Sequence, residues 1–255
     1  MTDARPTLSD KARKFASDLT ETVQNALGPE APRFVAEAAP SKTSGAELTR
    51  VIVRTDSNVE IPLAIDGEHA LNLIVEYTCE WDEHQAFLAV RKAHFHVFSA
   101  DADDPLFRYE FVDGMVSRLP SAHLHVHAHR DEMLYQMFRS ERARKARTRA
   151  KQVLEPKHKP PRLSTIHFPM GGTRMRPALE DVLQTLIEEF CVDHAPKAVE
   201  ALEAGRAEWR RHQIGALVRD APAEAVRVLS ALGYSVSWRG DGPEPSERTE
   251  RLSAI

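Results

Sequence analysis

The sequence predicts an α+β protein in which an antiparallel sheet of about six strands lies between an N-terminal helix and a C-terminal helical half. Three observations lead to this fold class. Apolar residues at helical spacing open the chain, segments of alternating polar and apolar residues follow, and helical spacing returns after residue 131. The connections between the alternating segments are too short for helical crossovers, which favours antiparallel pairing.

The N-terminal helical segment is expected over residues 1–46. Its main helix, residues 9–27, is predicted from apolar side chains at helical spacing, with Ser9 as the N-cap and Gly28 as the stop. A second short helix is expected over residues 31–38. The apolar face of the main helix consists of Ala12, Phe15, Leu19, Val23 and Leu27.

The sheet is expected within residues 47–130. Two short strands, 48–54 and 59–65, flank a four-residue turn and are predicted to form a hairpin. Longer strands rich in β-branched and aromatic residues follow at 71–82, 85–98, 106–112 and 122–130.

Residues 131–238 are expected to form a helical half that packs on the sheet. Helices are predicted at 132–153, 179–190, 196–218 and 222–232, with short strands at 163–168 and 234–238. The segment from Trp209 to Gln213 is interpreted as helix surface with one anchoring aromatic residue. The polar residues 239–255 have few apolar side chains to bury and are expected to form a flexible tail.

Composition excludes several classes of protein. Hydrophobic residues at 42% and charged residues at 28% match an ordinary globular chain, and no apolar stretch approaches the length of a membrane span. The first residues lack the apolar core of a secretory signal, so a cytoplasmic location is expected. Cys79 and Cys191 lie outside any CxxC pair and are expected to be core thiols. A net charge of -4 argues against a uniformly basic nucleic-acid-binding protein.

The strongest candidate site is one face of the strand predicted at 122–130. Side chains alternate across a strand, so four histidines share this face while the apolar residues between them face the core. The four are His123, His125, His127 and His129. His94 and His96 repeat the pattern on another strand, which predicts a surface rich in His, Glu and Arg, open to solvent or to a cleft. The alternative is an ordinary solvated sheet face.

Such a face suits hydrolysis of RNA or another phosphodiester. Histidines that titrate near neutrality can act as general base and general acid. The catalytic candidates are His123, His125 and His127, together with Glu110, and Arg108 would stabilise phosphate charge.

The same face also suits a divalent metal. Neutral imidazoles bind zinc, copper, nickel or iron, and a carboxylate from a neighbouring strand can complete an open site. That carboxylate would come from Glu110, Glu76 or Glu80. The candidate histidine ligands are His94, His96, His125, His127 and His129.

A second candidate site precedes the helix predicted at 179–190. Gly171 and Gly172 permit close backbone approach, and a helix N-terminus attracts anions through its unpaired amides. Arg174 and Arg176 would add charge-assisted contacts to a phosphate. The loop lacks the ending of a P-loop, and the alternative is a glycine turn between strand and helix.

A basic segment, residues 139–151, carries seven Lys and Arg side chains close to the histidine strand. It is interpreted either as an electrostatic footprint for RNA or DNA or as a solvated helix face. No aromatic residues that could stack on bases lie among these charges.

Two resemblances rest on these motifs. The HLHVHAHRD strand and the HFPMGG loop resemble those of an uncharacterised actinobacterial family over most of the chain, a likeness that implies no activity. Residues 81–129, with the FRYEF run and the histidine cluster, are similar to small histidine-rich toxins of bacterial toxin–antitoxin pairs. This second likeness implies ribonuclease activity.

The sequence therefore predicts a hydrolase directed at RNA or another phosphodiester. One alternative is a metal-dependent enzyme or metal-binding protein that uses the same histidines. A third is a non-catalytic interaction protein whose helical half binds a protein partner. The expected partners are RNA or another phosphate-bearing ligand and, through the helical half, a protein. No membrane is expected.

Overall fold

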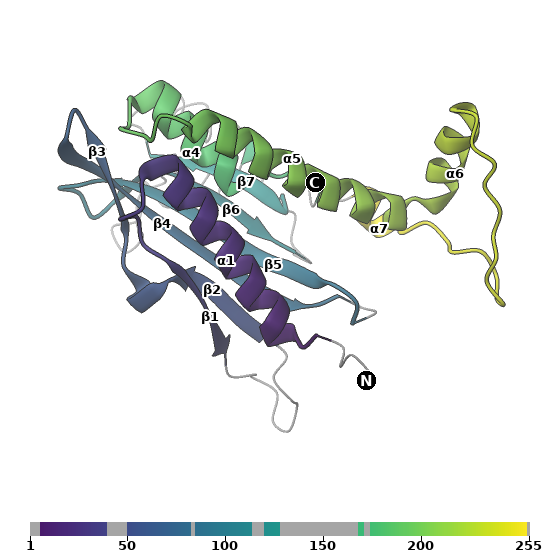
Figure 1. Cartoon of the computed structure of the whole chain (residues 1–255). Helices are drawn as coiled ribbons and strands as arrows, with labels where there is room; N and C mark the ends of the chain where they lie inside the picture. Colours follow the sequence, from purple (N-terminus) through teal and green to yellow (C-terminus); the bar gives the residue numbers. More distant parts are fainter. Residues whose placement is uncertain are drawn as a thin grey trace, which may run out of the picture.

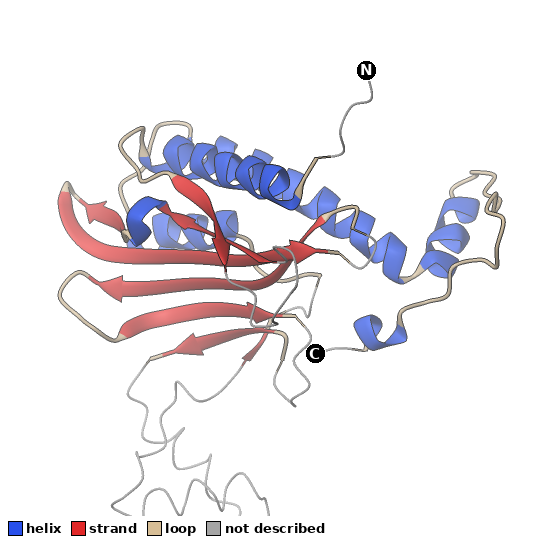
Figure 2. Cartoon of the chain, turned by 90° about the horizontal axis from the view of Figure 1, so that it is seen from below, coloured by secondary structure: helices blue, strands red, loops and turns tan. Residues whose placement is uncertain are grey.

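The computed structural model describes residues 6–39, 50–82, 85–113, 120–127, 168–170 and 174–253. Within these ranges, eight strands form one sheet, and every strand pair is antiparallel. Helices cover one face of this sheet (Figures 1 and 2). The predicted α+β class, with an N-terminal helix and a C-terminal helical region, is confirmed.

The strands follow the order β1-β2-β4-β5-β6-β7-β8 across the sheet, and β3 pairs with β4 beyond the end of β2. Their bounds are β1 (Phe34–Ala39), β2 (Arg50–Thr55), β3 (Ile61–Ile65), β4 (Glu68–Trp81), β5 (Leu88–Ser99), β6 (Pro105–Val112), β7 (Ala122–Val126) and β8 (Phe168–Pro169). The helices are α1 (Leu8–Leu27), the 3-10 helix η1 (Asp56–Asn58), α4 (Leu179–Phe190), α5 (Ala198–Asp220), α6 (Pro222–Ala231) and α7 (Thr249–Leu252).

The hydrophobic core lies between the sheet and its helices. Helix α1 packs across β1, β2, β4 and β5, and α5 packs on both α1 and α4. Leu73 of β4, Val23 of α1 and Leu183 of α4 are at most 1% exposed. A side chain of this size contributes roughly 1.5 to 3 kcal/mol when it is fully buried, so this layer accounts for most of the hydrophobic stabilisation.

Helix α1 begins earlier than its sequence pattern predicts. Thr7, rather than Ser9, is the N-cap, because the Thr7 hydroxyl accepts a hydrogen bond from the Asp10 amide at 3.2 Å. The Asp10 carboxylate in turn accepts from the Thr7 amide at 2.9 Å, which completes a capping box. These hydrogen bonds hold the pKa of Asp10 at about 2.

Two local predictions at the start of the sheet are wrong. The short helix expected over residues 31–38 is replaced by β1, which pairs along the whole of β2. The strands expected to form a hairpin do not pair with each other: β2 and β3 follow one another along the long strand β4. Pairing with β4 buries both strands on the core face, and this tertiary gain outweighs local propensity and turn length.

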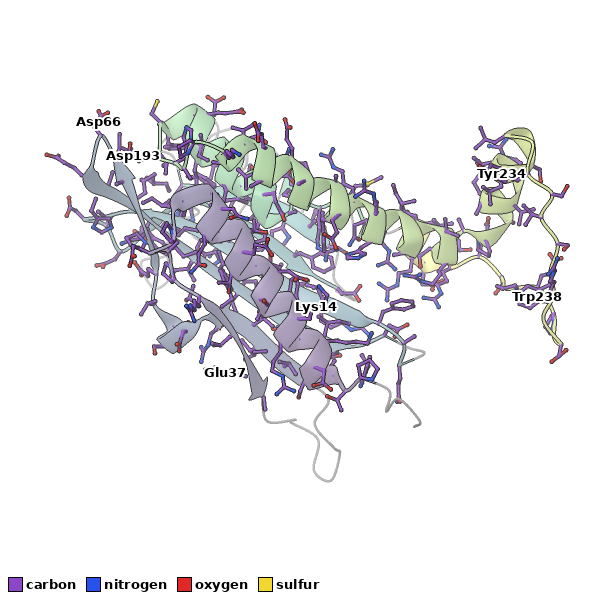
Figure 3. All side chains as sticks on the ribbon, in the orientation of Figure 1. Lys14, Glu37, Asp66, Asp193, Tyr234 and Trp238 are labelled. Atoms are coloured by element: carbon purple, nitrogen blue, oxygen red, sulfur yellow. The ribbon has the colours of Figure 1, made fainter. Side chains whose placement is uncertain are left out.

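The later elements follow their sequence patterns with three exceptions. Helices α4, α5 and α6 are confirmed. Residues 234–238 do not form the expected strand, and Tyr234 and Trp238 lie on an arm that projects away from the sheet (Figure 3). Cys79 is buried as expected, but Cys191 is exposed. Residues 249–252 of the expected tail form α7, from which Arg251 reaches the Asp113 carboxylate at 2.6 Å.

Several other predictions concern residues outside the described part of the chain. These include the basic helix over 132–153, with its Lys- and Arg-rich segment 139–151, and most of the strand expected over 163–168. Of the helices that the structure describes, none combines the length and apolar composition that crossing a bilayer requires.

Candidate metal centre

Register brings histidines, one glutamate and one arginine together on the face of the sheet opposite the helices. His123 and His125 of β7 lie opposite Glu110 and Arg108 of β6. On the other side of β6, the same two residues lie opposite His94 and His96 of β5. The predicted grouping of His, Glu and Arg side chains on one face is therefore confirmed for these strands.

This face is buried around β7, and the expectation that its histidines are open to solvent is wrong for two of them. His123 is 3% exposed and His125 is 1% exposed, whereas Val126 on the opposite face is 39% exposed. The two imidazole rings pack edge to face, with centroids 4.9 Å apart. Because the rings turn towards each other and towards Glu110, their polar atoms make contacts within the protein.

The Glu110 carboxylate lies at the centre of the cluster. Its Oε2 atom is 3.3 Å from Nε2 of His123 and 3.5 Å from Nε2 of His125. Its Oε1 atom is 3.2 Å from Nε2 of His96 and 3.3 Å from Nε of Arg108. The hydrogen bonds from His123, His125 and His96, and then the charge of Arg108, hold the pKa of Glu110 far below its ordinary value, so this carboxyl is ionised.

The hydrogen bonding of His123 fixes which of its ring nitrogens carries a proton. Nδ1 lies 2.9 Å from the carbonyl oxygen of Pro120, and a carbonyl can only accept, so Nδ1 donates. In the neutral ring, Nε2 then carries a lone pair that faces the lone pairs of Glu110 Oε2 at 3.3 Å. Two acceptors at this distance require a cation between or beside them, either a second proton on the ring or a metal ion.

The distances in the cluster suit a metal ion. The ligand atoms of Glu110, His123 and His125 all lie within 4.8 Å of one another. A tetrahedral ion bound at about 2.0 to 2.1 Å separates its ligand atoms by roughly 3.3 Å. The two Nε2–Oε2 distances, 3.3 and 3.5 Å, are close to that separation.

The remaining predicted ligands divide into three groups. Glu76 and Glu80 form ion pairs with arginines. A guanidinium nitrogen of Arg54 lies 4.0 Å from a carboxylate oxygen of Glu76, and one of Arg50 lies 2.9 Å from a carboxylate oxygen of Glu80. His94 stacks on His96 with ring centroids 5.7 Å apart, and burial lowers the pKa of His94.

His127 follows the end of β7 and is half-buried, and its backbone amide donates to the Leu106 carbonyl at 3.0 Å. His129 lies outside the described residues. Among the residues that the structure describes, the three-ligand group therefore consists of Glu110, His123 and His125.

The predicted anion loop is only partly described, since Gly171 and Gly172 lie outside the described ranges. Arg174 forms an ion pair with Asp220, with 2.7 Å between Nε and Oδ2. Arg176 is 7% exposed and lies between two aromatic rings, Phe111 and Trp209, on the helix-covered face. Arg174 is thus paired with a carboxylate, and Arg176 is held by two aromatic rings.

The sequence pattern predicts both histidines as site residues, but it favours only His125 as a metal ligand. His123 was expected only as an acid/base group, and its backbone partner Pro120 was not anticipated. Alternation of histidines is a sufficient sequence signal for the face, but the choice of Glu110 over Glu76 and Glu80 depends on ion pairs between strands. No sequence signal predicts the cavity that Trp209 and its neighbours line on the other side of the sheet.

No protein-family model, curated protein or solved structure matches this chain. The two family resemblances therefore stay predictions.

Proposed function

We propose that Glu110, His123 and His125 bind a divalent transition-metal ion, with zinc the best fit. The observation that carries this proposal is the contact of Nε2 of His123 with Oε2 of Glu110 at 3.3 Å while Nδ1 of His123 donates to a carbonyl. In the neutral ring both atoms are acceptors, and a bound cation would be coordinated by both. Two imidazoles and a carboxylate form a ligand set that zinc and iron(II) both accept, with at least one position left open.

The groups around the three ligands support the same proposal. Metal-bound histidines generally donate a hydrogen bond from their second ring nitrogen to a carbonyl or carboxylate oxygen, as His123 does to the Pro120 carbonyl. His96 and Arg108 contact Oε1 of Glu110 and leave Oε2 directed at the two buried histidines. Such contacts orient the carboxylate before a metal arrives, which reduces the entropy lost on binding.

Burial favours metal binding over direct acid/base catalysis by these two histidines. A general acid or base must come within hydrogen-bond distance of its substrate. His123 and His125, at 3% and 1% exposed, direct Nε2 at Glu110 instead. A zinc ion with an open position could still support hydrolysis by lowering the pKa of a bound water, so the predicted phosphodiester hydrolase is retained as a use of this centre.

Zinc titration of untagged, chelator-treated protein tests the proposal. We expect one zinc ion per chain in calorimetry, and X-ray absorption should show nitrogen and oxygen ligands at about 2.0 to 2.1 Å. Glu110→Gln, His123→Gln and His125→Gln should each weaken zinc binding by at least tenfold, because they replace an anionic carboxylate or an imidazole by a neutral amide, which is a poorer zinc ligand.

Two histidine variants serve as controls. His69 is exposed and hydrogen-bonded to Asn72, so His69→Gln should bind zinc as the wild type does. His94→Gln tests specificity within the same face and should also retain zinc. Absence of zinc binding, or equal binding by all three ligand variants and His69→Gln, would overturn the proposal. If the protein does not bind zinc, nitrogen NMR should show His123 protonated on both ring nitrogens.

A further inference from the structure

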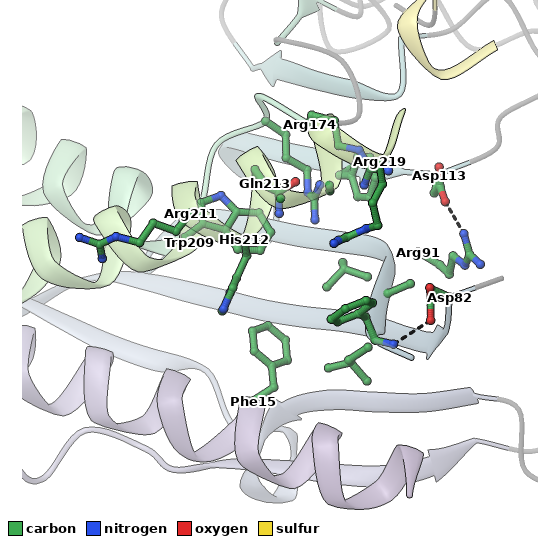
Figure 4. Close-up of a pocket in the computed structure, with 18 of the residues that line it drawn as sticks. Phe15, Asp82, Arg91, Asp113, Arg174, Trp209, Arg211, His212, Gln213 and Arg219 are labelled. Atoms are coloured by element: carbon green, nitrogen blue, oxygen red, sulfur yellow. Dashed lines mark hydrogen bonds and ion pairs between the residues drawn. The ribbon is translucent and has the colours of Figure 1, made fainter. Parts of the chain in front are cut away.

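A large cavity lies on the side of the sheet opposite the candidate metal centre. It has a volume of about 520 Å³ and lies between α1, α5 and one end of β5 and β6 (Figure 4). Phe15 of α1 approaches it from one side, and Trp209, His212 and Gln213 of α5 approach it from the other (Figure 4). This volume falls within the range of small-molecule sites, about 300 to 1,000 Å³.

The lining of the cavity carries a surplus of positive charge. Nine Lys and Arg side chains line it against five Asp and Glu side chains. Some of these arginines are neutralised locally: Arg174 pairs with Asp220, and Arg91 with Asp113. Arg211 and Arg219 form no ion pair with any carboxylate in the described residues, so their charges remain available for an anion.

Aromatic rings contact two of these arginines. The guanidinium of Arg176 lies 3.9 Å from the centre of the Phe111 ring and 4.8 Å from that of Trp209. That of Arg219 lies 4.5 Å from the centre of the exposed Phe87 ring. Flat guanidinium and aromatic surfaces stack well on planar rings, and guanidinium groups also match the geometry of phosphate oxygens.

A buried amide adds a group that a ligand could satisfy. Gln213 is 9% exposed, and its Oε1 atom is buried without a hydrogen-bond donor among the described residues. A buried acceptor without a donor destabilises the folded protein. Gln213 lines the cavity, so a ligand with an N–H or hydroxyl group could supply the donor.

We propose that this cavity binds a small organophosphate that carries a planar ring, in the class of nucleoside monophosphates. Arg219 contacts the phosphate, the ring lies against the aromatic wall, and a polar edge of the ligand donates to Gln213. This site is separate from the metal centre, because it lies between the sheet and the helices whereas Glu110 points to the opposite face.

Calorimetry on the full-length protein with AMP, GMP, CMP and UMP tests this proposal, with inorganic phosphate and the matching nucleosides as partial ligands. We expect saturable binding of at least one nucleotide, at least tenfold tighter than that of phosphate or its own nucleoside. Arg219→Ala should weaken this binding at least tenfold, since it removes a charge-assisted hydrogen bond to the phosphate. Gln213→Ala should weaken nucleotide and nucleoside binding alike.

Arg210→Ala is the matched control. Arg210 is an exposed arginine on the same helix and does not line the cavity, so its replacement should leave nucleotide binding unchanged. The proposal is overturned if no nucleotide binds, or if Arg219→Ala binds nucleotide as tightly as Arg210→Ala. Glu110→Gln should bind nucleotide normally, which makes failure here distinguishable from failure of the metal proposal.

Discussion

Glu110 is partly buried and Glu180 is buried, and the two glutamates lie on opposite sides of the sheet. The groups that surround them shift their pKa values in opposite directions. Glu110 contacts three histidines and an arginine, and these partners lower its pKa. Glu180, on α4, is 8% exposed within the helical layer, where burial raises its pKa. A carboxylate held by positive or hydrogen-bonding groups is prepared for a cation, whereas one buried among apolar groups resists ionisation.

The contrast extends to the two layers that contain these residues. The helix-covered layer gains stability from apolar side chains such as Leu183 and from arginines stacked on aromatic rings. The histidine layer gains little from apolar burial, since its best-buried side chains on β7 are His123 and His125. The first layer should therefore stabilise the fold under all conditions, and the second should depend on its ligand.

The largest expected effect comes from the helix-covered layer. Leu183→Ala should lower the free energy of unfolding by about 2 to 5 kcal/mol, because it removes a fully buried side chain and leaves a cavity. Urea denaturation with and without zinc measures this loss. Zinc should add the same increment to wild type and variant, since it binds on the other face; a smaller increment in the variant would contradict the independence of the layers. Leu232→Ala, at a residue 69% exposed, is the control.

The next effect concerns the contacts that orient Glu110. His96→Gln should weaken zinc binding about 10- to 100-fold, because it removes the imidazole that contacts Oε1 of Glu110. Competition with a chelating dye gives the affinity, and urea denaturation of the zinc-free protein should show little change. An unchanged zinc affinity would show that Glu110 does not depend on His96 for its orientation.

The smallest effect is a pH dependence in the helical layer. The pKa of Glu180 is raised above its ordinary value of 4.5, so the unfolded chain loses this proton first as the pH rises. The folded state therefore loses stability between pH 4.5 and the raised pKa. The free energy of unfolding of Glu180→Gln, taken relative to that of wild type, should therefore be higher at pH 7 than at pH 4.

Thermal denaturation of both proteins across this range provides the measurement. Other groups that titrate between these pH values are common to both proteins, so their contributions cancel in the difference. Glu189→Gln, an exposed residue on the same helix, should show no such divergence. A difference between Glu180→Gln and wild type that is constant with pH would show that Glu180 has the same pKa in the folded and unfolded chain.

Local pattern was sufficient for much of the fold and for part of the candidate site. The helical spacing of α1, α4, α5 and α6 and the alternation of β4 to β7 each reflect a face that must be buried, and such periodicity is visible in one sequence. It predicted β2 and β3 as strands but not their partner, because both pair with the long strand β4, and it missed β1, which pairs with β2.

The sequence by itself determined that His123 and His125 share one face of a strand, because side chains alternate along a strand. Only the tertiary structure decided that this face is buried and that Glu110, rather than Glu76 or Glu80, meets the histidines. It also brought Phe15, Arg91 and Gln213 around one cavity. The physical reason is that burial, ion pairing and cavities arise from contacts between segments distant in the chain, for which no local period exists.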